Sequence, residues 1–206
     1  MSFERVLVVG AGQMGAGIAQ VFAASGRRVL LHDAAPGAAE RGLDVMRKSL
    51  ERLAAKGQDL DPEDVLGRIA PVDDLAEADL MVEAVVEDAG VKEDVFRRAD
   101  DVLPEDAVLA SNTSSIPIAS LAAATGRPAR VIGMHFFNPV PVMALVEVVR
   151  APQTSEATVR AVVVLAEELG KTPAEVNDFP GFVSNRILMP LVNEAAYALQ
   201  DGVAQA

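Results

Sequence analysis

Short apolar runs alternate with helix-period segments along most of this chain, and this alternation restricts the possible folds more than any other feature. The runs of strand length are Arg5–Val9, Arg28–Leu31, Leu80–Val86, Ala107–Ala110, Val131–Met134 and Ala144–Val149. The helix-period segments between them are Gln13–Ser25, Ala38–Lys56, Val91–Val102 and Ser115–Ala124. Most of the runs are apolar throughout, which is typical of strands covered on both faces. The pattern therefore predicts the α/β class, with a doubly wound, mostly parallel sheet and helices on each side.

The helical segment that begins at Ala38 is longer than a crossover between two strands requires. Lys56-Gly57 follows it, and a second short helical segment at Pro62–Arg68 comes next, before the chain returns to the sheet at Ile69. Because parallel strands can be joined by one helix, the extra length needs another place to go. We expect an inserted helical hairpin that stands off the sheet.

The last part of the chain predicts a helix, a further strand and then a second helix. Thr154 lies in the N-cap region of a helix at 156–169, which Gly170 ends. The segment Pro173–Asn177 is compatible with a further strand. Phe179-Pro180-Gly181 has the composition of a boundary, and an apolar helix follows at 183–199. We therefore expect a sheet domain at 1–178 and the start of an all-α domain at 179–206.

A glycine-rich turn follows the first strand directly. Gly10-Ala11-Gly12-Gln13-Met14-Gly15 has the spacing G-x-G-x-x-G and opens the first helix. In such a turn the first glycine permits a tight bend, the second lets a pyrophosphate approach the backbone, and the third lets helix and strand pack closely. The anion is held by the free N–H groups at the start of the helix. The turn predicts a Rossmann-type dinucleotide site that includes Gln13 and Met14.

An acidic residue ends the second predicted strand. Asp33 lies about 20 residues after the glycine turn, where a carboxylate accepts hydrogen bonds from ribose hydroxyls and disfavours a 2′-phosphate. It therefore predicts NAD as the cofactor, in preference to NADP. The neighbouring His32 is interpreted as an ordinary residue at the end of a strand.

Three further polar features follow predicted strands or interrupt them. Ser114 lies in Ser-Asn-Thr-Ser-Ser, His135 begins His-Phe-Phe-Asn-Pro-Val-Pro, and Glu147 lies inside an apolar run. A buried carboxylate costs several kcal/mol unless it is paired or protonated, and His135 is the obvious partner across a turn. Such a pair fixes the imidazole tautomer and leaves the other ring nitrogen to take a proton. The spacing alone leaves open that Glu147 faces solvent from an edge strand.

Composition excludes several classes of function. The formal net charge is −12, and such a field repels polyanions, so nucleic acid is not an expected partner. The chain has no Cys and only 2 His, which excludes a thiolate zinc site, a cysteine nucleophile and a His-rich metal site. No apolar stretch approaches the ~20 residues of a transmembrane helix, and the first residues do not resemble a signal peptide. We expect a cytoplasmic protein without a membrane partner.

A basic island lies on the predicted hairpin of this acidic chain. Its members are Arg41, Arg47, Lys48, Arg52 and Lys56, with only Asp44 and Glu51 among them. A local excess of positive charge can attract a phosphorylated ligand despite the negative total. The same pattern is also compatible with a solvated helix face.

Four segments in this order resemble one known family. Gly-Ala-Gly-Gln-Met-Gly-Ala-Gly-Ile-Ala-Gln, Ser-Asn-Thr-Ser-Ser, His-Phe-Phe-Asn-Pro-Val-Pro with the following Leu-Val-Glu-Val, and Pro-Gly-Phe-Val-Ser-Asn-Arg are similar to segments of the L-3-hydroxyacyl-CoA dehydrogenases, which include bacterial 3-hydroxybutyryl-CoA dehydrogenases. The resemblance covers essentially the whole chain. It implies reversible NAD-dependent oxidation of an (S)-3-hydroxyacyl-CoA to the 3-oxoacyl-CoA. Fatty-acid β-oxidation, butanoate metabolism and aromatic-acid breakdown are the open pathways.

The resemblance also assigns roles to individual residues. His135 matches the general base that takes the C3 hydroxyl proton, and Glu147 matches the acid that orients it. Ser114 and Asn185 match the residues that hydrogen-bond the substrate oxygen and hold developing charge. The implied NAD contacts outside the glycine turn are Asp33, Glu87, Lys92, Ser114 and Asn138. The implied CoA contacts are Ser49, Lys56 and Ser114.

The family pattern continues into a mostly helical domain that closes over the active site and forms a homodimer. This chain ends one helix into that domain, and the helix presents a large apolar surface with no further chain to cover it. A truncated fragment, a sequence cut where order ends, and a helix that packs on another copy are all compatible with this ending. Two other functions stay open: oxidation of a non-CoA hydroxy acid, as in L-gulonate dehydrogenase and lambda-crystallin, and a non-catalytic NAD-binding fragment.

Overall fold

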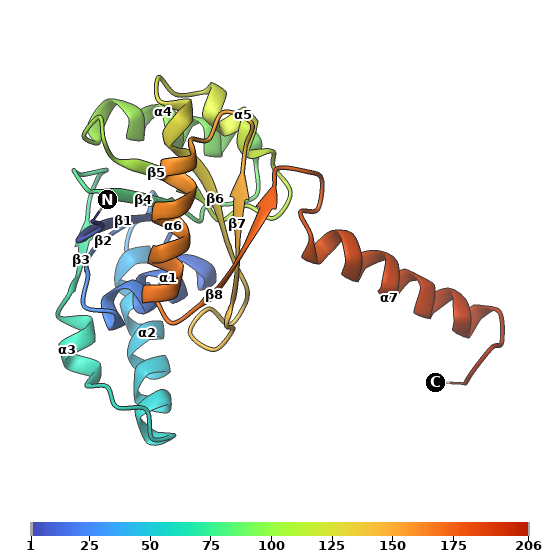
Figure 1. Cartoon of the computed structure of the whole chain (residues 1–206). Coiled ribbons are helices and arrows are strands. Elements are labelled where there is room, and N and C mark those ends of the chain that lie inside the picture. Colours follow the sequence, from blue (N-terminus) through green and yellow to red (C-terminus); the bar gives the residue numbers. More distant parts are fainter. Residues whose placement is uncertain (1, 206) are drawn as a thin grey trace.

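The fold is a sheet of eight strands with helices on both faces, followed by a helix that projects from it (Figure 1). The computed structural model describes residues 2–205. The strands are β1 (Arg5–Val9), β2 (Arg28–His32), β3 (Ile69–Val72), β4 (Leu80–Glu83), β5 (Val108–Ser111), β6 (Val131–Phe136), β7 (Leu145–Arg150) and β8 (Thr172–Asn177). The α-helices are α1 (Gln13–Ala24), α2 (Ala38–Ala55), α3 (Pro62–Leu66), α4 (Ala89–Val102), α5 (Ile118–Ala123), α6 (Glu156–Glu168) and α7 (Ser184–Gln200).

The strand order is β3-β2-β1-β4-β5-β6-β7-β8, so the direction of winding reverses between β1 and β4. Every pair of adjacent strands from β3 through β6 is parallel. Their apolar side chains divide between two buried clusters, one on each face of the sheet. This arrangement confirms the predicted doubly wound, mostly parallel sheet and places a ligand crevice at the reversal.

One strand departs from the parallel pattern. β7 runs antiparallel to β6, because the two are joined by the loop at 137–144 and not by a crossover helix. In this register His135 lies directly opposite Glu147. β8 then pairs in parallel with β7, so β7 is an interior strand and Glu147 does not lie on an edge.

The inserted hairpin is present as predicted and consists of α2 and α3. Asp61 caps α3 by accepting a hydrogen bond from the Glu63 backbone N–H at 2.9 Å. One side of α2 is anchored in the core through Met46 and Leu50, which are 1% and 0% exposed. The far end of α2 and the loop after it extend away from the sheet (Figure 1).

Two predicted boundaries were wrong. The apolar run that was expected to be a strand through Val86 ends as a strand at Glu83, and Val86 is 67% exposed in the connection to α4. The helix that was expected from Ser115 begins at Ile118. In both cases side-chain hydrogen bonds to Glu83 and Glu87 hold the backbone in irregular loops and replace the continued strand or helix.

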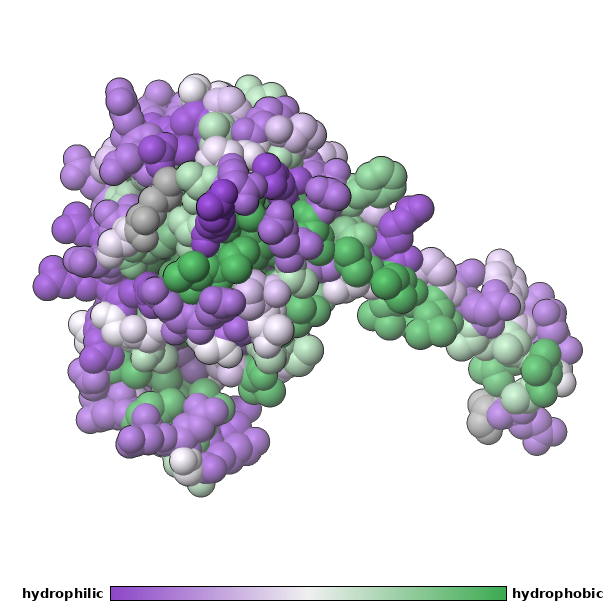
Figure 2. Space-filling view, in the orientation of Figure 1, coloured by the Kyte–Doolittle hydropathy of each residue, from purple (hydrophilic) through white to green (hydrophobic). Residues whose placement is uncertain are grey.

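α7 has no buried residue and projects away from the sheet and its covering helices (Figure 1). Its large apolar side chains are open to solvent, as shown by the exposed fractions of Ile187 (65%) and Leu191 (64%), and Figure 2 shows green atoms along this arm. The division into domains at 178 stays a prediction. Among the helices described between residues 2 and 205, none has the length and apolar character needed to cross a membrane.

Candidate active site

A cleft of about 940 Å³ opens at the carboxyl ends of β1, β2 and β4, on both sides of the winding reversal. Its lining includes the predicted cofactor residues Gly10, Gly12, Gln13, Met14 and Asp33. His32, Leu75, Val86, Val91 and Arg98 contribute to the remaining wall. The size and position of this cleft fit a dinucleotide.

The glycine turn has the shape that a pyrophosphate requires. A side chain at Gly10, where φ is +100°, would place its Cβ 2.5 Å from the carbonyl oxygen of Ala84, and one at Gly15 would place it 1.7 Å from the oxygen of Gly10. These two glycines therefore permit the bend and the close packing of α1 on β1. A Cβ at Gly12 meets no atom within 4 Å, because this position faces the open cleft at the N-terminus of α1. The turn fits NAD.

The substitution Gly12→Val should separate folding from cofactor binding. Because the protein leaves open space at this position, we expect the urea midpoint to stay near that of the unmodified chain. The added side chain projects into the space that a pyrophosphate needs, so NADH affinity should fall at least about tenfold. NADH fluorescence titration and urea unfolding measure the two effects. Unchanged NADH binding would contradict the assigned cofactor position.

Asp33 connects the glycine turn to the end of β2. Its Oδ2 accepts a hydrogen bond from the Ala11 N–H at 2.7 Å, and its Oδ1 accepts one from the Ala35 N–H at 2.8 Å. Both bonds fix the carboxylate at the edge of the cleft. Its contact with a ribose is therefore compatible with the structure and stays a prediction.

His135 lies near the end of β6, between two predicted partners. Its Nδ1 is 2.7 Å from Oε2 of Glu147, and its Nε2 is 3.0 Å from Oγ of Ser114. Because a carboxylate only accepts, Nδ1 carries the proton, and Nε2 then accepts from the Ser114 hydroxyl. The strand pairing between β6 and β7 and the loop after β5 bring these three side chains together.

Glu147 is 1% exposed and fully hydrogen-bonded. Its Oε1 accepts from the backbone N–H of Val183 at 3.1 Å, and from the N–H and hydroxyl of Ser184 at 2.8 and 3.0 Å. Burial by itself would raise the pKa of Glu147, but the bonds from His135 and Ser184 lower it below its usual value. Glu147 is therefore ionised and places a negative charge next to Nδ1 of His135.

Two aromatic rings enclose His135. The Phe137 ring centroid lies 4.7 Å away, and the Phe182 centroid lies 5.6 Å away in an edge-on arrangement. Phe182 is 5% exposed and has a φ of 47°, which is unusual for a residue with a side chain. The sequence did not predict these contacts of Phe182 and Ser184 with His135 and Glu147, although both residues lie in Pro-Gly-Phe-Val-Ser-Asn-Arg, one of the four segments that carry the family resemblance.

The other predicted residues are placed less directly. Asn185 lies in the first turn of α7, next to Ser184, and no hydrogen bond within residues 2–205 joins it to Ser114 or His135. Asn138 is exposed just after β6. Lys92 is 1% exposed and its ammonium is held by Glu83 and Glu87, and neither Lys92 nor Glu87 is among the residues that line the cleft. The ligand contacts of all three stay predictions.

The predicted CoA residues lie on the hairpin. Ser49 is half-buried on α2, and Lys56 is exposed at its end. Arg47 of the basic island forms an ion pair with Glu63 of α3, which neutralises part of the charge. The island is therefore weaker than the sequence alone indicates.

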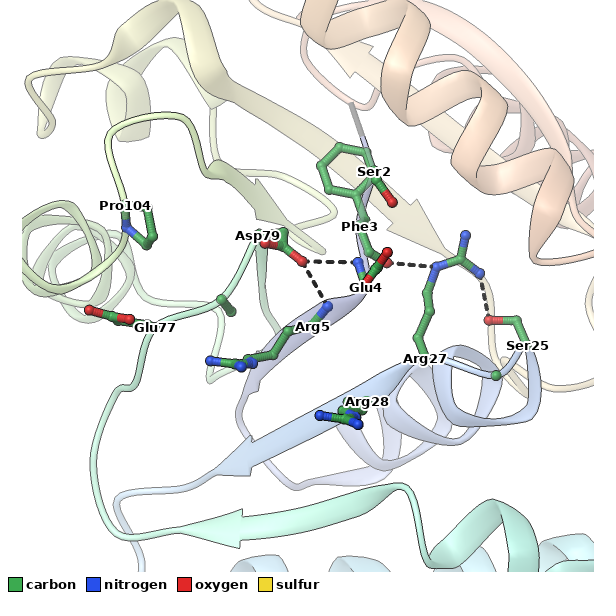
Figure 3. Close-up of a pocket in the computed structure, with 12 residues that line it drawn as sticks. Ser2, Phe3, Glu4, Arg5, Ser25, Arg27, Arg28, Glu77, Asp79 and Pro104 are labelled. Carbon is green, nitrogen blue, oxygen red and sulfur yellow. Dashed lines mark hydrogen bonds between the residues drawn. The ribbon is translucent and has the colours of Figure 1, made fainter.

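A second cleft, of about 610 Å³, lies at the opposite end of the strands, where the amino ends of β1, β2 and β4 meet (Figure 3). Its polar groups are used to join the amino ends of strands: Asp79 accepts from the N–H groups of Glu4 and Arg5, and Arg27 donates to the carbonyl of Phe3. Equal numbers of basic and acidic side chains line this cleft. It contains none of the predicted site residues and has no charge bias toward an ionic ligand.

Glu87 predicts a specific pH dependence of stability. Burial alone would raise its pKa, but bonds from Thr113, Ser114 and Ser115 and the charge of Lys92 lower the pKa from 4.5 to about 2. The unfolded chain therefore binds the proton first, and the stabilisation by Glu87 is present above about pH 4.5 and lost toward pH 2. We expect the unfolding free energy of Glu87→Gln to fall less steeply over this range. Urea unfolding measures it, with the exposed Glu194→Gln as the control; identical slopes for Glu87→Gln and the unmodified chain would contradict it.

Comparisons with known proteins agree with this geometry. Residues 5–179 match the family described as 3-hydroxyacyl-CoA dehydrogenase, NAD binding domain. A probable 3-hydroxybutyryl-CoA dehydrogenase of Deinococcus radiodurans is 55% identical over 202 residues, which are 96% of this chain and 73% of that protein. The human mitochondrial hydroxyacyl-coenzyme A dehydrogenase is 42% identical, over 98% of this chain and 68% of that protein.

The crystal structure of (S)-3-hydroxybutyryl-CoA dehydrogenase PaaH1 from Ralstonia eutropha has a TM-score of 0.95 and 45% identity, over 98% of this chain and 74% of that chain. Fold, cleft and sequence together define an NAD-dependent oxidoreductase. More specifically, the chain belongs to the 3-hydroxyacyl-CoA dehydrogenase family, among relatives named 3-hydroxybutyryl-CoA dehydrogenase. The predicted fold class, cofactor and enzyme class are confirmed.

Proposed function

We propose that this chain catalyses the reversible NAD-dependent oxidation of an (S)-3-hydroxyacyl-CoA to the 3-oxoacyl-CoA. The observation that carries the proposal is the hydrogen-bonded series Glu147–His135–Ser114, which lies on the same side of the sheet's strand ends as the NAD cleft. The named relatives act on 3-hydroxybutyryl-CoA or hydroxyacyl-CoA, which supports the substrate class.

His135 acts as the general base on the substrate hydroxyl. Its Nδ1–H is engaged by Glu147, so Nε2 is the nitrogen that takes the proton. The ionised Glu147 stabilises the imidazolium that forms. When bound, NAD would supply the acceptor for the hydride that leaves the carbon bearing this hydroxyl.

Ser114 supports the substrate oxygen. Its hydroxyl is 3.0 Å from Nε2, so an oxygen that binds beside it meets a hydrogen-bond donor and the base together. Asn185 is one helical position past Ser184 and is the second proposed donor to this oxygen. In the reverse direction, the same groups polarise a 3-oxo group and return the proton.

The hairpin is the proposed site for CoA, and charge reversal tests it. We expect Lys56→Glu to raise the KM for acetoacetyl-CoA at least about tenfold with little change in kcat, because a phosphate contact becomes a repulsion. Arg160→Glu on the exposed face of α6 makes the same charge change and is the control. An unchanged KM in Lys56→Glu would favour a hydroxy acid without CoA as the substrate.

The last part of the proposal concerns the exposed apolar surface of α7. We propose that this surface is covered either by a second copy of the chain, in a homodimer, or by a helical domain. Leu188, Leu191 and Val192 are all about half or more exposed on consecutive turns. Surfaces of this kind are typical of contact sites.

The direct test follows NADH absorbance with acetoacetyl-CoA as the oxidant. The proposal predicts oxidation of NADH that depends on the CoA thioester and is not supported by NADPH. NADH binding without any oxidation, in a chain with His135 and Glu147 in place, would instead identify a non-catalytic NAD-binding module.

A further inference from the structure

A closed ring of side chains lies beneath the loop that carries Ser114. Glu83, the last residue of β4, accepts from Lys92 Nζ at 2.6 Å and from the Ser111 hydroxyl at 2.6 Å. Ser111 in turn accepts from the Thr113 N–H at 3.1 Å, and the Thr113 hydroxyl donates to Glu87 at 2.5 Å. Lys92 closes the ring, since its Nζ lies 3.3 Å from the other oxygen of Glu87.

Four of the five ring members are buried, whereas the Glu87 side chain is 41% exposed and forms the outer side of the ring. Glu83 and Ser111 are 0% exposed, and Thr113 and Lys92 are 1% exposed. The Lys92 ammonium donates hydrogen bonds to Glu83 and, at 3.3 Å, to the Val85 carbonyl, and it forms an ion pair with Glu87. Burying a carboxylate and an ammonium without complete pairing would cost several kcal/mol. Loss of one bond in the ring would therefore leave a buried charge incompletely paired and destabilise the protein. For this reason the ring favours a single geometry.

Ser114 is attached to this ring through Glu87. One oxygen of Glu87 accepts from the Ser114 N–H at 2.9 Å and from the N–H and hydroxyl of Ser115 at 3.0 and 2.9 Å. The residues between β5 and α5 have no regular secondary structure, so these bonds determine the course of the loop. The Ser114 hydroxyl is then directed at Nε2 of His135, 3.0 Å away.

We propose that the ring of Glu83, Lys92, Ser111, Thr113 and Glu87 is a positioning device that sets Ser114 against His135, with Glu83 as its buried anchor. The proposal rests on the roles proposed above for Ser114 and His135. Glu83, Ser111 and Thr113 act through Ser114 and are positioning residues. They connect the end of β4, where the cofactor cleft lies, to the oxygen-binding serine at the end of β5.

The first test observes His135 without substrate. The chain has 2 His, so the ring ¹⁵N signals of His135 can be assigned by their loss in His135→Gln. In mildly alkaline buffer, Nε2 accepts from Ser114, and loss of this bond moves its ¹⁵N signal downfield. Ser114→Ala gives the shift for complete loss. We expect Thr113→Val to move the signal most of the way to that value and Thr113→Ser, which keeps the hydroxyl, to leave it unchanged.

Ser111→Ala interrupts the ring at a second point and leaves the bonds that the Thr113 hydroxyl accepts from the loop backbone intact. If Thr113→Val does not fold, Ser111→Ala decides whether the ring positions Ser114. We expect Ser111→Ala to move the ¹⁵N signal of His135 Nε2 downfield as well. Ser120→Ala is the matched control and should keep the original signal, because the Ser120 hydroxyl donates to the Pro117 carbonyl and, within residues 2–205, to no member of the ring. Unchanged His135 signals in Ser111→Ala and in every folded Thr113→Val sample would overturn the proposal.

The second test is kinetic. With acetoacetyl-CoA and NADH, we expect Thr113→Val and Ser111→Ala to lower kcat about tenfold, with the KM for NADH within about twofold of the original. Thr113→Ser should retain kcat, whereas a role limited to packing of the methyl group would reverse this order and contradict the proposal. If the unmodified chain does not turn over the substrate, the proposed function fails, and the ¹⁵N result still decides whether the ring positions Ser114.

Discussion

His135→Gln is expected to lower kcat for acetoacetyl-CoA by about 10³-fold or more, while NADH binding stays within about twofold. Glutamine is close to histidine in size and can still donate toward Glu147, so the pocket formed by Phe137 and Phe182 should persist. It has no nitrogen that can take a proton at neutral pH. The loss should therefore fall on the chemical step and not on the cofactor site.

Steady-state kinetics and NADH fluorescence, measured on the same preparation, separate the two effects. A loss of NADH affinity as large as the loss of kcat would show that His135 supports the structure of the cleft and not the reaction. Gly12→Val provides the opposite pattern for comparison, because it is expected to weaken NADH binding directly.

Glu147→Gln is expected to lower kcat by about 10²-fold and also to destabilise the protein by about 1–3 kcal/mol. The kinetic loss arises because the amide leaves the imidazolium without a counter-charge and can turn the ring to the wrong tautomer. The stability loss arises because an amide has only one accepting oxygen: with its nitrogen toward Val183 and Ser184 it cannot accept their three hydrogen bonds, and with its nitrogen toward His135 it cannot accept the bond from Nδ1–H.

Ser184→Ala is the control that separates these contributions. It removes one donor to Oε1 and leaves the bond between Glu147 and His135 in place. We expect part of the stability loss in urea unfolding and a kcat near the original. If Ser184→Ala lowered kcat as strongly as Glu147→Gln, the effect of Glu147 would come from anchoring the start of α7.

Much of the fold could be predicted because the local pattern and the tertiary structure agree. Gly10, Gly12 and Gly15 lie between a buried strand and a helix, and the long segment from Ala38 had no place in the sheet, so the turn and the hairpin followed from spacing alone. The pairing of β6 with β7 could be anticipated because a carboxylate at Glu147 needs a partner and His135 lies across a short loop.

The ring around Glu83 could not be predicted in the same way, although its signal was present. Glu83 also interrupts an apolar run, as Glu147 does, and Lys92 follows nine residues later. The apolar run through Val86 predicts a longer strand than the structure has. The pattern therefore does not show that β4 ends at Glu83, where the chain turns. The other ring members, Ser111 and Thr113, lie at the end of β5 and in the loop after it, and β5 is adjacent to β4 only in the folded sheet.

The most direct test of the central claim is the initial rate of NADH oxidation by acetoacetyl-CoA, measured for the unmodified chain and for His135→Gln side by side. Our account predicts CoA-dependent oxidation by the unmodified chain and a rate lower by about 10³-fold in the variant, with equal NADH binding by both. Equal rates in the two proteins, or no oxidation by an unmodified chain that binds NADH, would contradict it.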